Sequence, residues 1–199
     1  MKILLLRHGE TIWNIEGRLQ GCRDIPLTDT GMAQISTTGA HLAASGIHID
    51  HIVSSPLLRA QKSAEIIAAA INYPAENITT SPLFLERGFG ECEGLVYEEA
   101  IKKYPDGNYP GMETLEELYA RAEAAIQYLE NNYHGQTILV AAHGAFIKSV
   151  LGIVTGGIIA YFDKDVWIEN GTYCLLEKNA GIWKVSVHSR SAEFAPKFI

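Results

Sequence analysis

Residues 2–9 read Lys-Ile-Leu-Leu-Leu-Arg-His-Gly, and they give the strongest indication of the fold class. The four apolar residues from Ile3 to Leu6 are typical of a short strand that is buried on both faces. Such strands occur in α/β proteins, in which helices cover both sides of a mainly parallel sheet. The run ends in Arg7-His8-Gly9, so a cation and an imidazole follow the strand at its carboxyl end. Open α/β sheets bind their ligands at that end.

Beyond this stretch, the chain alternates between strand and helix patterns. Ser55-Pro56 provides a cap and a first-turn proline for one helix, and Thr114 with Glu117 forms a capping-box pattern for another. Two segments, 172–177 and 183–188, flank Asn179-Ala180-Gly181 and predict a β-hairpin. We expect further strands at 51–54, 77–80 and 137–142, and helices at 30–45, 57–72, 97–104, 114–132 and 145–154.

This alternation predicts a three-layer α/β/α fold with a mainly parallel sheet. A chain of 199 residues without repeats or linkers fits one domain, 1–199. The segment at about 86–113 is rich in glycine and proline, so we interpret it as a short lid insertion that is mostly loop.

Composition narrows the class of partner and the compartment. The net charge of −7 argues against a nucleic-acid binder, which normally carries a basic face. Three scattered cysteines without metal-ligand spacing suit a reducing compartment, and no signal-peptide pattern or membrane-spanning stretch is present. We therefore expect a cytoplasmic protein that needs no metal and no cofactor, with its oligomeric state left open.

The chemistry gathers where two predicted strands end in His-Gly. His8-Gly9 follows the first strand, and His143-Gly144 follows the strand at 137–142. Arg59 lies one turn into the helix after the strand at 51–54. Either His-Gly pair alone is more often only a turn, but both together, each after an apolar strand, suggest a common site. If the two strands are neighbours, Arg7, Arg59 and two histidines meet around one anion, as in a phosphate-transfer pocket.

Several sequence blocks then resemble the histidine phosphatase superfamily, in its cofactor-dependent phosphoglycerate mutase-like branch. The N-terminal block, Arg7-His8-Gly9-Glu10-Thr11 with Asn14, is the most specific of them. The blocks follow the family's order and spacing from residue 3 to about residue 155. The others are Gly21, Asp24-Ile25-Pro26-Leu27-Thr28 with Gly31, Ser54-Ser55-Pro56-Leu57-Leu58-Arg59-Ala60, Glu86-Arg87-Gly88, Gly111-Met112-Glu113-Thr114 with Arg121, and His143-Gly144.

The resemblance implies a role for each matching residue. His8 would accept the phosphoryl group, and Glu86 would protonate the leaving oxygen. The phosphate would be surrounded by Arg7, Arg59 and His143, with a hydrogen bond from Asn14. Gln20, Gly21 and Gly144 would bind on the substrate side. His8 has to be neutral at its attacking nitrogen, so its other ring nitrogen needs an acceptor, for which we expect a backbone carbonyl. His143 would serve best when protonated.

The family contains phosphatases and mutases, and the sequence favours a phosphatase. Only about 20 residues separate Gly94 from Thr114, no arginine lies between Arg87 and Arg121, and Phe89 stands where the mutases have a tyrosine. A short, acidic lid leaves water better access to a phosphohistidine. Phosphoglycerate mutase-type transfer between hydroxyls is the alternative, and a non-catalytic protein that binds a phosphorylated ligand is another.

The expected substrate is a small phosphate ester. Similar proteins of this size include α-ribazole phosphatases and broad-specificity phosphatases. The apolar side chains of the expected lid would tolerate an aromatic or nucleoside-like leaving group, so α-ribazole 5'-phosphate is a candidate. These side chains are Leu83, Phe84, Phe89, Tyr97, Tyr104, Tyr109 and Met112.

Overall fold

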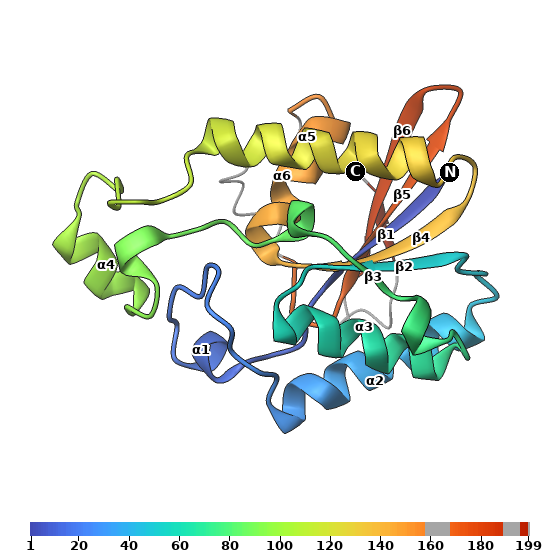
Figure 1. The fold of residues 1–199 in the computed structure, drawn as a ribbon, viewed down its shortest axis with the longest axis horizontal. Helices are drawn as coiled ribbons and strands as arrows, with labels where there is room; N and C mark the ends of the chain where they lie inside the picture. Colours follow the sequence, from blue (N-terminus) through green and yellow to red (C-terminus); the bar gives the residue numbers. More distant parts are fainter. Residues whose placement is uncertain (158–167, 189–195, 199) are drawn as a thin grey trace.

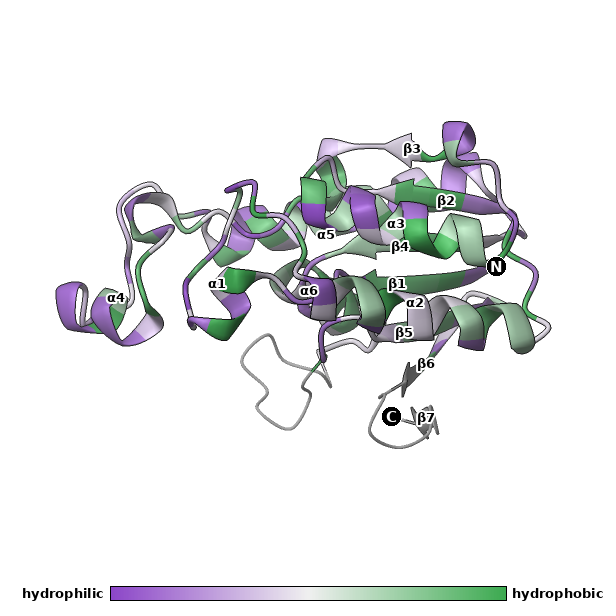
Figure 2. Ribbon diagram, turned by 90° about the horizontal axis from the view of Figure 1, so that it is seen from below, coloured by the Kyte–Doolittle hydropathy of each residue, from purple (hydrophilic) through white to green (hydrophobic). Residues whose placement is uncertain are grey.

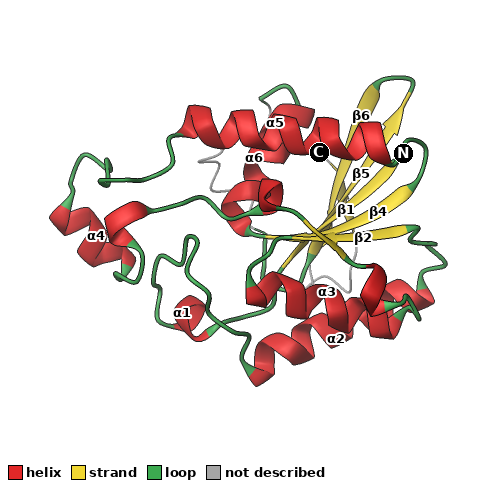
Figure 3. Cartoon of the chain, viewed as in Figure 1, coloured by secondary structure: helices red, strands yellow, loops and turns green. Residues whose placement is uncertain are grey.

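The computed structural model describes residues 1–157, 168–188 and 196–198. Within them, seven strands form one sheet in the order β3-β2-β4-β1-β5-β6-β7 (Figure 2), and Figure 3 labels β2, β4, β1, β5 and β6 among them. The strands are β1 Lys2–Arg7, β2 His51–Ser54, β3 Thr79–Thr80, β4 Thr137–Ala142, β5 Tyr173–Asn179, β6 Ile182–His188 and β7 Pro196–Phe198.

The sheet is mixed. β1, β4, β2 and β3 run parallel, whereas β5 pairs with β1 in the antiparallel direction and continues into the antiparallel strands β6 and β7. The expected parallel arrangement therefore holds for four of these strands, and the antiparallel remainder consists of the predicted C-terminal hairpin, β5 and β6, and the additional strand β7. The hairpin turns at Ala180 and Gly181, whose φ values of 49° and 83° match a two-residue primed turn.

Helices cover both faces of the sheet, which confirms the predicted α/β/α layers. α2 and α3 lie on one side, and α5 and α6 lie on the other (Figure 1). β1 shows why both faces are needed. Ile3 and Leu5 pack into the cluster with α5 and α6, while Leu4 and Leu6 pack into the cluster with α2 and α3. The helices are α1 Ile12–Ile15, α2 Asp29–Ala44, α3 Leu58–Ala70, α4 Tyr97–Lys103, α5 Leu115–Asn132 and α6 Gly144–Val154.

Most predicted elements are present within two residues of their expected ends. The strands at 51–54 and 137–142 have the predicted bounds. β3 is shorter than expected because Ala75–Asn77 forms a 3₁₀ turn that ends the connection before the strand. The one-turn helix α1 was not predicted; the Thr11 hydroxyl caps it by accepting the Asn14 N–H at 3.2 Å.

The candidate site residues lie at one end of the sheet, beyond the carboxyl ends of β1 and β4. The strands at the centre of the sheet are mainly apolar, and the loops and helices around them are more polar (Figure 2). α1 and α4 lie beyond the carboxyl ends of β1 and β4, on the side opposite the N-terminus (Figure 2). Residues 86–113, which contain α4, therefore lie at the end of the sheet where Arg7-His8 and His143 emerge.

No helix among the described residues has the length and apolar character that crossing a membrane would require.

Candidate active site

Two buried histidines stand side by side at the end of the central strands. β1 and β4 are neighbours, with Arg7 opposite Ala142 in the register. His8 and His143 follow directly, and the His8 N–H extends the pairing by donating to the Ala142 carbonyl at 3.1 Å. Their ring centroids are 5.2 Å apart, and the residues are only 2% and 0% exposed. The condition set by the sequence, that the two His-Gly strands be neighbours, is met.

The protonation state of His8 follows from its surroundings. Nδ1 lies 2.7 Å from the Gly9 carbonyl, which can only accept, so the proton is on Nδ1 and Nε2 carries the lone pair. Burial lowers the pKa of His8 well below 6.5, and the charges of Arg59 and Arg7 lower it further. The imidazole is therefore neutral, as a nucleophile must be. The expected backbone acceptor is present.

His143 is held by Ser55, which follows β2, the neighbour of β4 on the side away from β1. Its Nε2 lies 2.8 Å from the Ser55 hydroxyl, and its buried Nδ1 has no hydrogen-bond partner among the described residues. Burial, followed by the charge of Arg59, lowers the pKa of His143 well below 6.5. The neutral form therefore dominates here, in contrast to the protonated form that the sequence favoured. A neutral ring still has one N–H to donate to an anion.

The two arginines reach the site in different ways. Arg59 is fully buried and uses its two terminal nitrogens to bind the carbonyls of Arg23 and Gly21 at 2.7 and 2.8 Å. Its Nε is buried without a hydrogen-bond partner among the described residues. Arg7 donates to the Ile168 carbonyl at 2.6 Å, and desolvation lowers its pKa to about 10. Two positive charges are thus fixed beside the histidines by the backbone.

Glu86 lies against the start of α6. Its carboxylate accepts the N–H groups of Ala145 and Phe146 at 3.3 and 3.1 Å, and its own neighbour Arg87 donates to it at 2.9 Å. The N-terminal N–H groups of a helix favour an anion, so α6 holds this carboxylate in place. Because α6 begins directly after His143, Glu86 is brought to the same site.

The remaining predicted site residues line the same region. Thr11 fixes two amides: its backbone N–H donates to Asn14 Oδ1 at 3.0 Å, and its hydroxyl lies 3.0 Å from Gln20 Oε1. Gly21 has a φ of 52°, and a Cβ there would come within 2.0 Å of a Glu93 carboxylate oxygen, so any other residue would be strained and would displace the Glu93 side chain. Gly144 begins α6, where an added Cβ would make an ordinary contact with Arg7.

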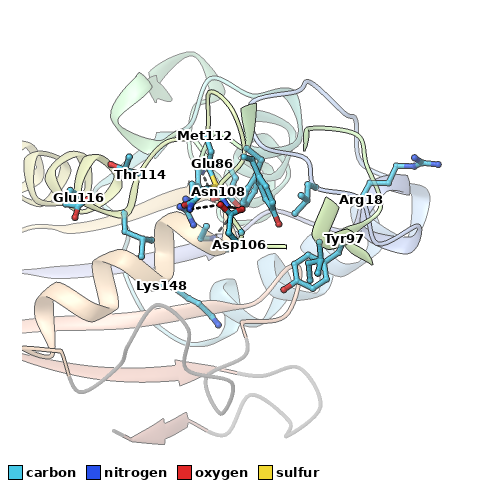
Figure 4. A pocket seen from close by; sticks show the side chains of 18 of the residues that line it. Arg18, Glu86, Tyr97, Asp106, Asn108, Met112, Thr114, Glu116 and Lys148 are labelled. Atoms are coloured by element: carbon cyan, nitrogen blue, oxygen red, sulfur yellow. Dashed lines mark hydrogen bonds between the residues drawn. The ribbon is translucent and has the colours of Figure 1, made fainter. Parts of the chain in front are cut away.

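Two connected cavities occupy this end of the molecule. A small cavity of about 140 Å³ is lined by Arg7, His8, Asn14, Gln20, Gly21, Arg59 and Glu86, among others. A large cleft of about 1120 Å³ shares Arg7 and Glu86 with it and extends along residues 86–116. Glu86, Tyr97 and Met112 are among the side chains that line the cleft (Figure 4). The arrangement offers a polar cup that opens into a wider, more apolar cleft.

Several contributors to the site carry no signal in the local sequence. The Asn170 amide donates to the His8 carbonyl at 3.1 Å and lies 3.3 Å from Asn14 Oδ1. These contacts join the segment just before β5 to the loop that begins at His8. Ser55, Arg121 and Glu113 lie within the blocks that resemble the family, but the resemblance implied no role for them. In the part of the chain that the structure describes, no three metal-ligating side chains gather to form an ion site.

Comparison with known proteins agrees with this geometry. The model of the histidine phosphatase superfamily (branch 1) matches residues 3–190. A Bacillus subtilis protein described as an uncharacterized phosphatase, PhoE, is 42% identical over 155 residues, which is 78% of each chain. Phosphoglycerate mutase-like protein 4 of Arabidopsis thaliana is 37% identical over 161 residues, 75% of this chain and 69% of that protein.

Among solved structures, the α-ribazole phosphatase from Shigella flexneri superimposes with a TM-score of 0.80 over 94% of this chain and 95% of its own. At 22% identity, that likeness shows a shared fold. The sequence relatives and the match over residues 3–190 carry the assignment further. The chain belongs to the histidine phosphatase superfamily and is an enzyme of the phosphatase type.

Proposed function

We propose that the chain is a phosphomonoesterase that works through a phosphohistidine on His8. Nε2 of His8 attacks the phosphorus of a small phosphate ester, the P–N bond forms, and the bond to the leaving oxygen breaks. The observation that carries the proposal is the 2.7 Å contact between His8 Nδ1 and the Gly9 carbonyl. It leaves the Nε2 lone pair of a neutral imidazole on the side of the ring away from that carbonyl.

The groups around His8 suit a transition state whose charge is spread over three oxygens. We assign Arg7, Arg59 and the Nδ1–H of His143 to these oxygens, with a further hydrogen bond from Asn14. The buried donors at Arg59 Nε and His143 Nδ1, which have no hydrogen-bond partner among the described residues, support this assignment. A phosphate at the cup would supply acceptors for both.

Glu86 is the proposed acid and base. It gives a proton to the leaving oxygen in the first step. In the second step it takes a proton from the water that attacks the phosphohistidine, and the P–N bond breaks to release phosphate. Glu86 lines both the small cavity and the large cleft, which supports a position between the phosphate and the leaving group. We place Gln20, Gly21 and Gly144 on the substrate side.

The 86–113 segment favours release of the phosphoryl group to water over its return to a second hydroxyl, because few cations of this segment are placed to hold a substrate carboxylate. Lys102 and Lys103 are exposed on α4 and do not line either cavity. Arg87 is 6% exposed and donates to the Glu113 carbonyl at 2.9 Å, so it serves the segment itself. The 86–113 segment therefore offers a phosphoglycerate carboxylate few cations, and among the other basic residues that line the large cleft, Arg18 and Lys148 come from outside this segment. We propose that the chain acts as one domain, with residues 86–113 as its lid.

The apolar wall of the cleft supports a substrate class. Phe89, Tyr97, Tyr109 and Met112 line it, together with Ile101. Such a wall suits an aromatic or nucleoside-like leaving group, and α-ribazole 5'-phosphate is the specific candidate. Faster turnover of 3-phosphoglycerate than of α-ribazole phosphate would contradict this choice.

The proposed setting is the cytoplasm, with a small metabolite as the partner. The three cysteines are unpaired, which suits a reducing compartment, and the net charge of −7 disfavours nucleic acid.

The test uses His8→Ala with His48→Ala, an exposed histidine, as its matched control. We expect wild type and the control to hydrolyse p-nitrophenyl phosphate and to carry acid-labile radiolabel from a labelled ester during turnover. His8→Ala should lose both the label and at least about a thousandfold in rate, since the nucleophile is gone. A His8→Ala enzyme that matches wild type would rule out the mechanism. Isomerisation of 3-phosphoglycerate that depends on 2,3-bisphosphoglycerate would instead indicate a mutase.

A further inference from the structure

Arg121 and Glu113 form an ion pair beside the segment that carries Glu86. Arg121 lies on α5, and its Nε and Nη2 each approach one carboxylate oxygen of Glu113 at 2.8 Å. Both side chains are 18% exposed. This two-pronged geometry fixes the plane of the guanidinium, which a single charge contact would not do.

The guanidinium uses its other donors on the backbone just before and at Glu86. Nη1 donates to the carbonyls of Leu83 and Leu85 at 3.1 and 2.7 Å, and Nη2 lies 3.3 Å from the carbonyl of Glu86 itself. Past the 3₁₀ turn Pro82–Phe84, residues 85–89 have no helix or strand of their own to set their path. Arg121 therefore supplies the contacts that regular structure would otherwise provide.

Glu113 holds the chain on the other side of Glu86. Its carbonyl accepts Arg87 Nε at 2.9 Å, its carboxylate accepts the Gly88 N–H at 3.3 Å, and its N–H donates to the Gly88 carbonyl at 2.9 Å. Arg121 also lies over the ring of Phe146, at 5.6 Å, and the Phe146 N–H binds the Glu86 carboxylate. The Arg121–Glu113 ion pair thus contacts the backbone on both sides of Glu86. Its guanidinium also contacts Phe146, whose N–H binds the Glu86 carboxylate.

We propose that the Arg121–Glu113 pair positions Glu86 for proton transfer to the leaving oxygen. The inference rests on the acid role proposed for Glu86. Arg121 lines neither cavity, so it acts through Glu86 and not on the substrate. Because proton transfer needs the donor within hydrogen-bond reach, a displaced carboxyl slows only those esters whose leaving oxygen must be protonated.

This selectivity separates positioning from general support of the fold. p-Nitrophenolate leaves readily without a proton, whereas the alkoxide of glycerol phosphate needs one. The quantity to compare is kcat/KM for the two esters, because it covers steps only as far as departure of the leaving group and omits hydrolysis of the phosphohistidine. A loosened fold would lower both values in proportion.

The experiment measures both esters with Arg121→Gln, Arg121→Lys and Glu113→Gln. We expect kcat/KM for glycerol phosphate to fall about 10- to 100-fold, the range for a displacement near 1 Å, with less than about a threefold change for p-nitrophenyl phosphate. Arg121→Lys should share the selective loss, because an ammonium can pair with Glu113 but lacks the fork that reaches the three carbonyls. Turnover of p-nitrophenyl phosphate by the same sample shows that the protein is folded.

Two further variants separate the possible failures. Glu130→Gln removes an ion pair with Lys178 from the same helix, away from the cavities, and should leave the ratio of the two kcat/KM values unchanged. Glu86→Gln should lose about 10²- to 10⁴-fold in kcat/KM for glycerol phosphate and clearly less in kcat/KM for p-nitrophenyl phosphate, while kcat falls for both esters because Glu86 also accepts the proton of the attacking water. If Glu86→Gln is selective but the Arg121 variants slow both esters equally or neither, positioning is overturned and the acid role stands. If Glu86→Gln lowers both kcat/KM values equally, the acid role fails and the positioning proposal fails with it.

Discussion

At the scale of single residues, two neutral histidines are buried where two arginines are also held. Desolvation is the main reason that the pKa values of His8 and His143 lie well below 6.5. In the unfolded chain each imidazole would bind a proton below about pH 6.5, whereas the folded protein keeps both neutral. Folding therefore becomes less favourable as the pH falls below that value.

We predict that the free energy of unfolding rises with pH up to about 6.5 and then levels off. Each histidine contributes a slope of up to about 1.4 kcal/mol per pH unit below that point. Urea denaturation at several pH values measures the slope. In His8→Ala it should drop by roughly half, because one of the two groups is removed. An unchanged slope in that variant would show that His8 is not held neutral.

At the scale of elements, α5 is the support for the Glu86 segment, and its first turn is fixed by one cap. The Thr114 hydroxyl accepts the Glu117 N–H at 3.1 Å, and the Glu117 carboxylate accepts the Thr114 N–H at 2.9 Å. This capping box was predicted from the sequence. Thr114 is the N-cap residue of α5, so Glu113 lies just before the helix and its ion pair with Arg121 reaches over about the first two turns of α5.

Thr114→Ala is expected to lower the free energy of unfolding by about 1 kcal/mol, the usual worth of such a cap. Thr114 is exposed, so little packing is lost with the side chain. Thr114→Ser keeps the hydroxyl and is the matched control, for which we expect little change. Chemical denaturation measures both. Equal stability of the alanine and serine variants would indicate that the cap contributes nothing.

At the scale of the whole molecule, the central strands couple the core to the site. β1 packs into both apolar clusters and ends in Arg7-His8. A loss of packing along β1 therefore weakens the core on both sides of the sheet, and it destabilises the strand that carries Arg7 and the following His8.

Leu4→Ala should lower the free energy of unfolding by about 2–5 kcal/mol, because Leu4 is fully buried and a cavity would remain. Leu58→Ala is the matched control: this leucine is 50% exposed, so we expect a change within about 0.5 kcal/mol. Thermal or urea unfolding compares the two. Similar losses for both leucines would contradict the packing described for β1.

Local order was readable from the sequence because it depends on neighbours along the chain. The apolar runs at 51–54 and 137–142 gave strands with the predicted bounds, and Thr114 with Glu117 gave the cap. The His-Gly pairs also marked the carboxyl ends of two strands before their pairing was known. β3 fell short of its expected length because a turn, not the strand, took residues 75–77.

The fold class, the family blocks and the candidate residues His8, Arg59, Glu86 and His143 could all be predicted from the amino-acid sequence. The contacts that hold these residues became visible only in the folded protein: Asn170 binds the His8 carbonyl from 162 positions away, and Arg121 binds the Glu86 carbonyl from 35 positions away. The physical reason is that these hydrogen bonds exist only once the strand order and the loop paths are set. The donors are common polar residues, and no local sequence pattern indicates which distant residue each of them will bind.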